Sequence, residues 1–295
     1  MTSLLWLGVV LGVLVVIALG LRAVGAHRWA ELIRTQTNQL ELGRVDVQSP
    51  APGPLRSPAR FDARELEGLP APVQRYFRAV LTDGQPIIVA GTIEMVGTIN
   101  LSETADQWKP FTSHQRVVTG RPGFLWDAQV DMFPGVPARV VDSYITGQGH
   151  LIAKLLGLFP VASAHGGGEM ARGEFMRYFA EAAWYPTALL PSQGVRWQAV
   201  DDASAKATIV DGPITLTLLF RFNEAGLIAS VLAESRGAGV GKDMVMLPWD
   251  CTLSDYQPQD GMLLPMTGEA AWVRPEGRKA YFVGHVKKLS YELLS

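Results

Sequence analysis

The stretch FLWDAQVDM, Phe124 to Met132, decides the fold class of this chain. Polar side chains at Asp127, Gln129 and Asp131 alternate with apolar ones. The apolar set is Phe124, Trp126, Ala128, Val130 and Met132. Because successive side chains of a strand point to opposite faces, this pattern predicts a strand with one buried and one wet face. The segment ITLTLLFRF, residues 214–222, repeats the alternation.

Segments of similar texture lie on both sides of these two. Further strands are expected at residues 87–99, 107–119, 138–147, 195–200, 205–210, 227–235, 245–256, 263–273 and 280–291. Short connections containing glycine, at residues 223–226 and 274–277, are typical of hairpins, which pair neighbouring strands antiparallel. A sheet of about ten strands tends to curl. The sequence therefore predicts an α+β fold: a large curved antiparallel β-sheet, half-barrel-like, covered by a few helices.

Two short helices are candidates for part of that cover. Residues 71–81 carry an apolar face, with Pro72 in the first turn, where its missing N–H costs little. Residues 151–159 are a short apolar segment that can form a helix. A flexible break at residues 165–168, which contains three successive glycines, is expected to follow.

The main cover is expected in EMARGEFMRYFAEAAWYPTALLP, residues 169–191. A helix over residues 169–183 has a charged arc, consisting of Glu169, Glu174, Arg177 and Glu181. The opposite arc is apolar and consists of Phe175, Met176, Tyr178, Phe179 and Ala182. The charges are three and four residues apart, which predicts ordinary ion pairs on a solvated face. Pro186 then ends the helix, because proline disfavours helical angles in the preceding residue.

Arg172 departs from this pattern, because it projects from the apolar side of the helix. An unpaired buried charge is costly. Three interpretations stay open: a structural ion pair, a side chain that extends along the apolar surface to reach solvent, and a binding site for an anionic ligand.

The N-terminal run SLLWLGVVLGVLVVIALGL, from Ser3 to Leu21, carries no charge. As a helix it would span about 28 Å, close to the hydrocarbon thickness of a bilayer. We interpret residues 1–26 as a single-pass transmembrane anchor in the cell membrane. Two alternatives are a core helix of a soluble protein and a signal peptide cleaved near residues 24–26. The length of the run and the lack of a preceding Lys or Arg favour the uncleaved anchor.

Basic residues after the span bear on topology. Arg22, Arg28 and Arg34 follow it, so the positive-inside rule favours a cytoplasmic domain, although a large domain can override that bias. Residues 27–60 are expected to form a juxtamembrane helix and a tether, with four prolines at 48–58 that favour an extended chain. Residues 61–295 are expected to form a single β-rich α+β domain.

Composition and motifs exclude several classes. A formal charge of −2 and the lack of a basic run argue against a nucleic-acid partner. The HGGG run at 165–168 has no G-x-S-x-G nucleophile elbow to accompany it. Residues 237–242 depart from a phosphate-binding loop at Arg236 and Asp243, and are expected to form a hairpin loop instead. Cys251 is the single cysteine, and the five histidines show no metal-ligand spacing. We therefore predict a protein that is not an enzyme, with no catalytic residue, metal or cofactor.

Several blocks of the sequence are distinctive. They are FLWDAQVDMFPGVPARVVDSYITGQGHLIAKLLGLFPVA, AAWYPTALLP, LPAPVQRYFRAVL, MLPWDCTLSDYQ and GMLLPMTGEAAWV. Together they resemble a family of bacterial membrane-anchored proteins known only as a domain of unknown function. This resemblance covers nearly all of the chain after the tether and implies no activity. The order strands, helices, strands also resembles, at the level of fold, the lipoprotein-carrier (LolA-like) half-barrels, in which a curved sheet holds lipid chains.

Two functions follow as hypotheses. The first is a membrane-anchored protein that binds lipid or another apolar small molecule in a groove between sheet and helices. The residues expected at that groove are Phe124, Trp126, Arg172, Phe179, Trp184 and Tyr185. The alternative is a non-catalytic envelope module that binds or assembles with another protein through the same aromatic surface.

Overall fold

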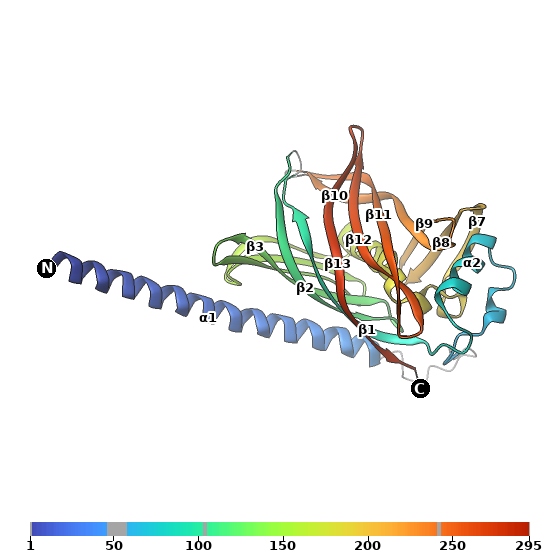
Figure 1. Cartoon of the computed structure of the whole chain (residues 1–295), viewed down its shortest axis with the longest axis horizontal. Helices are drawn as coiled ribbons and strands as arrows, with labels where there is room; N and C mark the ends of the chain where they lie inside the picture. Colours follow the sequence, from blue (N-terminus) through green and yellow to red (C-terminus); the bar gives the residue numbers. More distant parts are fainter. Residues whose placement is uncertain (1, 46–57, 103–104, 241–242, 295) are drawn as a thin grey trace.

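The computed structural model describes residues 2–45, 58–102, 105–240 and 243–294 (Figure 1). Thirteen strands form one antiparallel sheet, which confirms the predicted fold class. The first six are β1 (Ile88–Asn100), β2 (Trp108–Val118), β3 (Gly123–Phe133), β4 (Val136–Ile145), β5 (Gln148–Leu155) and β6 (Phe159–Gly166). The other seven are β7 (Arg196–Asp201), β8 (Ser204–Asp211), β9 (Ile214–Phe222), β10 (Ile228–Val240), β11 (Asp243–Gln259), β12 (Met262–Arg274) and β13 (Gly277–Leu293).

The order of the strands explains why helices cross the sheet. It runs β6-β5-β4-β3-β2-β1-β13-β12-β11-β10-β9-β8-β7. Two meanders, β1 to β6 and β7 to β13, therefore meet at the central pair β1 and β13, where Thr92 lies opposite Ser290. The strands β6 and β7 are the two edges, so the chain between them has to cross one whole face of the sheet.

That crossing segment is helical. It contains α3 (Gly168–Ala180) and the 3₁₀ helices η3 (Glu181–Trp184), η4 (Pro186–Leu189) and η5 (Pro191–Gln193). Tyr144 of β4 stacks on Phe175 of α3 at 5.0 Å between ring centroids, and Phe179 meets Phe220 of β9 at 5.6 Å. The predicted helix over residues 169–183 is confirmed, with its last turn tightened into η3. It covers the concave face of the sheet.

The short helix expected near residues 71–81 is α2 (Ala71–Val80), which follows η2 (Ala63–Leu66). Its apolar face packs in the main core, where Tyr76 and Phe77 are fully buried. Pro72 lies in the first turn, as predicted.

The prediction of a helix at residues 151–159 is wrong, because this segment forms most of β5, a turn and the first residue of β6. Val140 of β4 lies opposite Ala153, and Phe159 lies opposite Leu155 across the next hairpin. The chain reverses at Leu156 and Gly157, whose φ angles are 54° and 72°. A short apolar run fits strand and helix equally well, and here pairing with β4 decides.

Two expected loops begin later than predicted. The break expected at residues 165–168 starts only after Gly166, which still pairs with Gly149 of β5. The loop expected at residues 237–242 is strand as far as Val240, and residues 241–242 lie outside the described part.

The N-terminal helix α1 (Thr2–Val45) is one continuous helix, and its second half packs on the convex face of the sheet (Figure 1). Trp29 Nε1 donates to Asp127 Oδ1 at 2.9 Å, and the two lie beside buried Leu125. The face of β3 predicted to be wet is therefore partly covered by α1. Burial under the helix raises the pKa of Asp127. Apart from Pro58, the tether expected at residues 48–58 lies outside the described residues.

A close approach fixes where α1 docks. A Cβ atom on Gly25 would lie 1.9 Å from the carbonyl oxygen of Leu156, so only glycine lets the helix pass this turn. Arg22 Nη1 donates to the carbonyl of Gly135 at 3.0 Å, and Arg44 Nη1 bonds Glu292 at 2.7 Å. The helix is thus held at both ends of its contact with the sheet. Residues before Arg22 project away from it (Figure 1).

Candidate functional site

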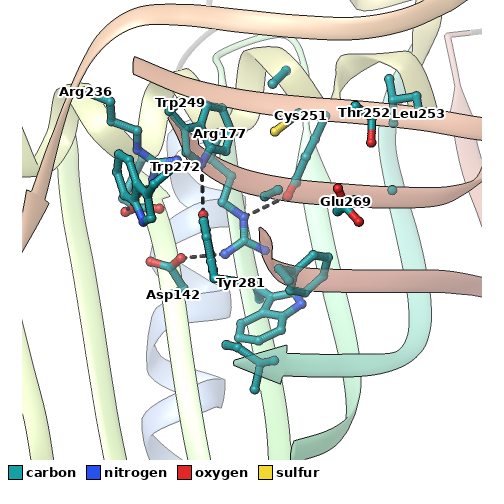
Figure 2. A pocket seen from close by; sticks show the side chains of 18 of the residues that line it. Asp142, Arg177, Arg236, Trp249, Cys251, Thr252, Leu253, Glu269, Trp272 and Tyr281 are labelled. Atoms are coloured by element: carbon teal, nitrogen blue, oxygen red, sulfur yellow. Dashed lines mark hydrogen bonds and ion pairs between the residues drawn. The ribbon is translucent and has the colours of Figure 1, made fainter. Parts of the chain in front are cut away.

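A cavity of about 290 Å³ lies between the concave face of the sheet and the crossing helices. Figure 2 shows it from close by. Its lining consists of Ile99, Trp126, Val140, Asp142, Leu151, Glu174, Arg177, Ala180, Glu181, Trp184, Arg236, Trp249, Cys251, Thr252, Leu253, Gly268, Glu269, Ala270, Trp272, Tyr281 and Phe282. The residues come from both meanders and from α3 and η3, so the site exists only once the two halves of the sheet have joined.

Most of its wall is aromatic and aliphatic. Trp249 of β11 lies opposite Trp272 of β12, and Trp249 Nε1 donates to the Tyr281 hydroxyl at 2.9 Å. Trp184 Nε1 donates to the carbonyl of Pro265 at 2.7 Å, which fixes that ring against the sheet. Phe282 of β13 completes the wall. Apolar walls held in fixed orientation are typical of sites for small molecules.

Arg177 of α3 is the centre of a saturated ion-pair network. Its Nη1 donates to Asp142 of β4, its Nε donates to Glu181 at 2.7 Å, and its Nη2 donates to Gln115 at 3.3 Å. The guanidinium also lies 4.9 Å from the ring centroids of Phe124 and Trp126. Burial alone would lower the pKa of Arg177, but the nearby carboxylates outweigh it and raise the pKa. Arg177 therefore stays charged.

Arg236 of β10 is the second buried cation, and it is less well paired. Its side chain is 9% exposed, and its Nη2 lies 3.6 Å from Glu174 Oε1, beyond ordinary hydrogen-bond length. The guanidinium lies over Trp249 at 4.2 Å and Trp272 at 5.8 Å. Its Nη1 is buried, and no described residue accepts a hydrogen bond from it. Figure 2 shows Arg236 beside these two rings.

The carboxyl of Glu174 of α3 has a pKa well above its ordinary value. Burial is the main cause that raises the pKa of its carboxyl, and the negative charge of Asp142 adds to it, against the lowering effects of Arg236 and Arg177. Glu174 Oε2 and Asp142 Oδ1 are both buried without a fixed partner among the described residues.

Catalytic chemistry finds little support in these side chains. Burial raises the pKa of the Cys251 thiol, so this cysteine stays protonated and is a poor nucleophile. Burial likewise raises the pKa of Tyr281. Within the described ranges, no three His, Cys, Asp or Glu side chains are grouped so that they could hold a metal ion.

The six residues expected at the groove are placed differently from one another. Trp126 and Trp184 line the cavity. Phe124, Phe179 and Tyr185 are fully buried in the core around it. Arg172 is partly exposed and does not line the cavity. Its Nη1 is buried, and no described group pairs with it.

The prediction of a solvated charged arc on α3 holds for the exposed Glu169 and is wrong for its other three residues. Glu174, Arg177 and Glu181 face the concave sheet and line the cavity, because strands far away in the sequence supply their partners. Sequence reasoning also missed Arg236, Trp249 and Trp272. Arg236 was noted only as a departure from a phosphate-binding loop, and no spacing in the sequence connects it with Glu174.

Fold and site together define a protein with an open antiparallel half-barrel and a half-open cavity between the sheet and its helical cover. The family model described as "Family of unknown function (DUF6920)" matches residues 67–291, and the chain belongs to this family. The expected family membership is thereby confirmed. No curated protein matches the chain.

Solved structures give low-scoring matches to the fold. A LolA superfamily protein from Nitrosomonas europaea has a TM-score of 0.40 at 8% identity, covering 76% of this chain and 93% of that one. A beta-barrel-like protein of a domain of unknown function (DUF1849) from Brucella abortus has a TM-score of 0.23 at 11% identity, covering 70% of this chain and 99% of that one. The expected fold-level resemblance to LolA-like proteins is found among these neighbours.

Proposed function

We propose that this protein binds lipid or another apolar small molecule in the cavity between α3 and the concave face of the sheet, while α1 anchors it in a membrane. The observation that carries the proposal is the cavity itself, about 290 Å³ of space inside the apolar core. Ligand pockets start near this volume. At about 30 Å³ for each water-sized group, it holds roughly ten such groups, enough for a short chain or the end of a longer one.

The walls support an apolar ligand over a polar one. Four tryptophan rings and Phe282 line the space, and they offer contact area to a hydrocarbon. Each CH₂ removed from water contributes about 0.8 kcal/mol, so a chain of a few carbons gains useful affinity. A densely packed core would leave no such room.

The first half of α1 supports the anchor. It is the one described helix long and apolar enough to cross a membrane, and its large side chains are exposed, Trp6 by 70%. Exposed apolar surface of that extent needs an apolar environment. Since α1 meets the sheet at Arg22, the segment Ser3 to Leu21 is free to span the bilayer while the cavity stays close to it. A lipid-derived ligand would be within short reach.

Native mass spectrometry tests the proposal. The full chain, purified from membranes into lipid nanodiscs, is expected to carry a bound small molecule in a defined ratio. Ala270→Leu, which places a larger side chain in the cavity, is expected to lose that mass. Ala199→Leu, at an exposed position of β7, is the matched control and should keep it. A wild-type chain with only its own mass, or equal adducts on all three proteins, would count against the proposal.

A further inference from the structure

Two side chains that line the cavity carry a buried hydrogen-bond donor with no acceptor among the described residues. Arg236 Nη1 and Trp126 Nε1 are buried, their side chains line the cavity, and no described residue accepts from either. Nearly all buried hydrogen-bond donors in folded proteins have an acceptor, and a donor left without one destabilises the fold. An unpaired donor at an internal cavity is explained if the ligand supplies the acceptor.

The acidic residues of the cavity do not meet this need, because none of them accepts a hydrogen bond from either donor. Asp142 and Glu181 accept from Arg177. Glu174 Oε1 lies 3.6 Å from Arg236 Nη2, beyond ordinary hydrogen-bond length. Glu269, the last acid of the lining, bonds Arg278 instead. Of the two arginines that line the cavity, Arg236 is thus the one that no described carboxylate approaches within ordinary hydrogen-bond length.

We propose that the cavity binds a single-chain amphiphile whose anionic head group accepts hydrogen bonds from Arg236, with its hydrocarbon chain along the tryptophan wall. This inference rests on the proposed function and specifies the ligand class. Guanidinium groups bind carboxylate and phosphate oxygens alike, because both match the planar fork. The stacking of Arg236 on Trp249 and Trp272 holds that fork in place before the ligand arrives.

The size of the cavity sets the chain length of the probes. With room for roughly ten water-sized groups, ten-carbon chains are suitable. Decanoate and decyl phosphate carry the two anionic head groups, decanol is neutral, and decylammonium is cationic. Each is titrated calorimetrically into the full chain in lipid nanodiscs. Ala270→Leu in the same nanodiscs serves as the blank for partition into lipid.

Decanoate, decyl phosphate or both are expected to bind at least about tenfold more tightly than decanol, and decylammonium least tightly. Which of the two anions binds better identifies the head group. Arg236→Met is expected to remove the preference for anions over decanol. Arg236→Lys, which keeps the charge and loses the fork, should retain part of that preference.

The head-group series on the wild-type chain decides the matter even if a variant fails to fold. Decanol that binds as tightly as both anions, or a preference for decylammonium, would overturn the assignment of Arg236 while leaving an apolar site in place. If none of the four chains binds above the blank, the proposed function itself fails, and this inference fails with it.

Discussion

Filling the cavity should stabilise the fold, and Ala270→Leu is the change to make. Ala270 of β12 lies opposite Cys251 and Phe282, and all three line the cavity. The variant adds three carbons, worth about 2.4 kcal/mol at about 0.8 kcal/mol for each buried CH₂. Fixing the leucine side chain costs about 0.5–1 kcal/mol. The net gain is therefore about 1.5 kcal/mol.

Thermal unfolding of the full chain in nanodiscs, followed by circular dichroism, measures this gain. For a domain of about 200 residues, about 1.5 kcal/mol corresponds to a rise in Tm of roughly 3–6 °C. The matched control is the neighbouring residue Ala271, which is fully buried and does not line the cavity. Ala271→Leu overpacks a filled site, which costs about 1–3 kcal/mol.

The test is whether Ala270→Leu raises Tm while Ala271→Leu lowers it. If Ala270→Leu lowers Tm as much as Ala271→Leu does, the space beside Ala270 is already occupied by side chains. The reasoning about a ligand cavity would then be refuted.

Three further changes test the docking of α1 and the buried charges. Gly25→Leu should detach the second half of α1, because the added Cβ meets Leu156, and hydrogen exchange over residues 26–45 should become faster. Gly20 has open space around it, so Gly20→Leu should leave this exchange unchanged. Slow exchange in both variants would contradict the docking. Arg177→Met should cost about 3–5 kcal/mol of unfolding free energy, because it leaves Asp142 and Glu181 buried without their cation, whereas the exposed Arg34→Met should cost under about 1 kcal/mol. Equal losses in denaturant titrations would show that the network is not buried. The pKa of Glu174 is raised in the folded protein, where the side chain faces Asp142, Arg177 and Arg236. Between the ordinary glutamate pKa and this raised pKa, the folded chain binds the proton more tightly than the unfolded chain does. The free energy of unfolding should therefore fall as pH rises through that range. Glu174→Gln should flatten this part of the curve of Tm against pH, and an unchanged slope would mean that Glu174 ionises normally.

The sheet could be predicted because its signal is local. Alternation along FLWDAQVDM and ITLTLLFRF marks strands without knowledge of their partners, and all the predicted strand segments are found. The segment at residues 151–159 failed because short apolar runs carry no period that separates strand from helix. Its pairing with β4, across the turn at Thr146 and Gly147, decides, and the apolar run itself does not reveal that pairing.

The site could be predicted only in part, because the strand order brings together residues that are far apart in the sequence. Helical spacing placed Glu174, Arg177 and Glu181 correctly on one arc of α3. Whether that arc faces water depends on the path of the chain from edge strand β6 to edge strand β7. Arg236 lies on the second meander, about sixty residues from α3, and pairs with Glu174 only after the sheet has formed. No local pattern reports such a contact.

Quenching by a brominated chain tests most directly whether the cavity holds an apolar ligand. Bromine quenches tryptophan on contact, and four of the eight tryptophans line the cavity: Trp126, Trp184, Trp249 and Trp272. In nanodiscs, 10-bromodecanoate should quench wild-type fluorescence saturably, and decanoate should reverse it. Ala270→Leu should leave only the weak, unsaturable quenching of Trp6 in the apolar segment. Unsaturable quenching of equal size in both proteins would contradict the account.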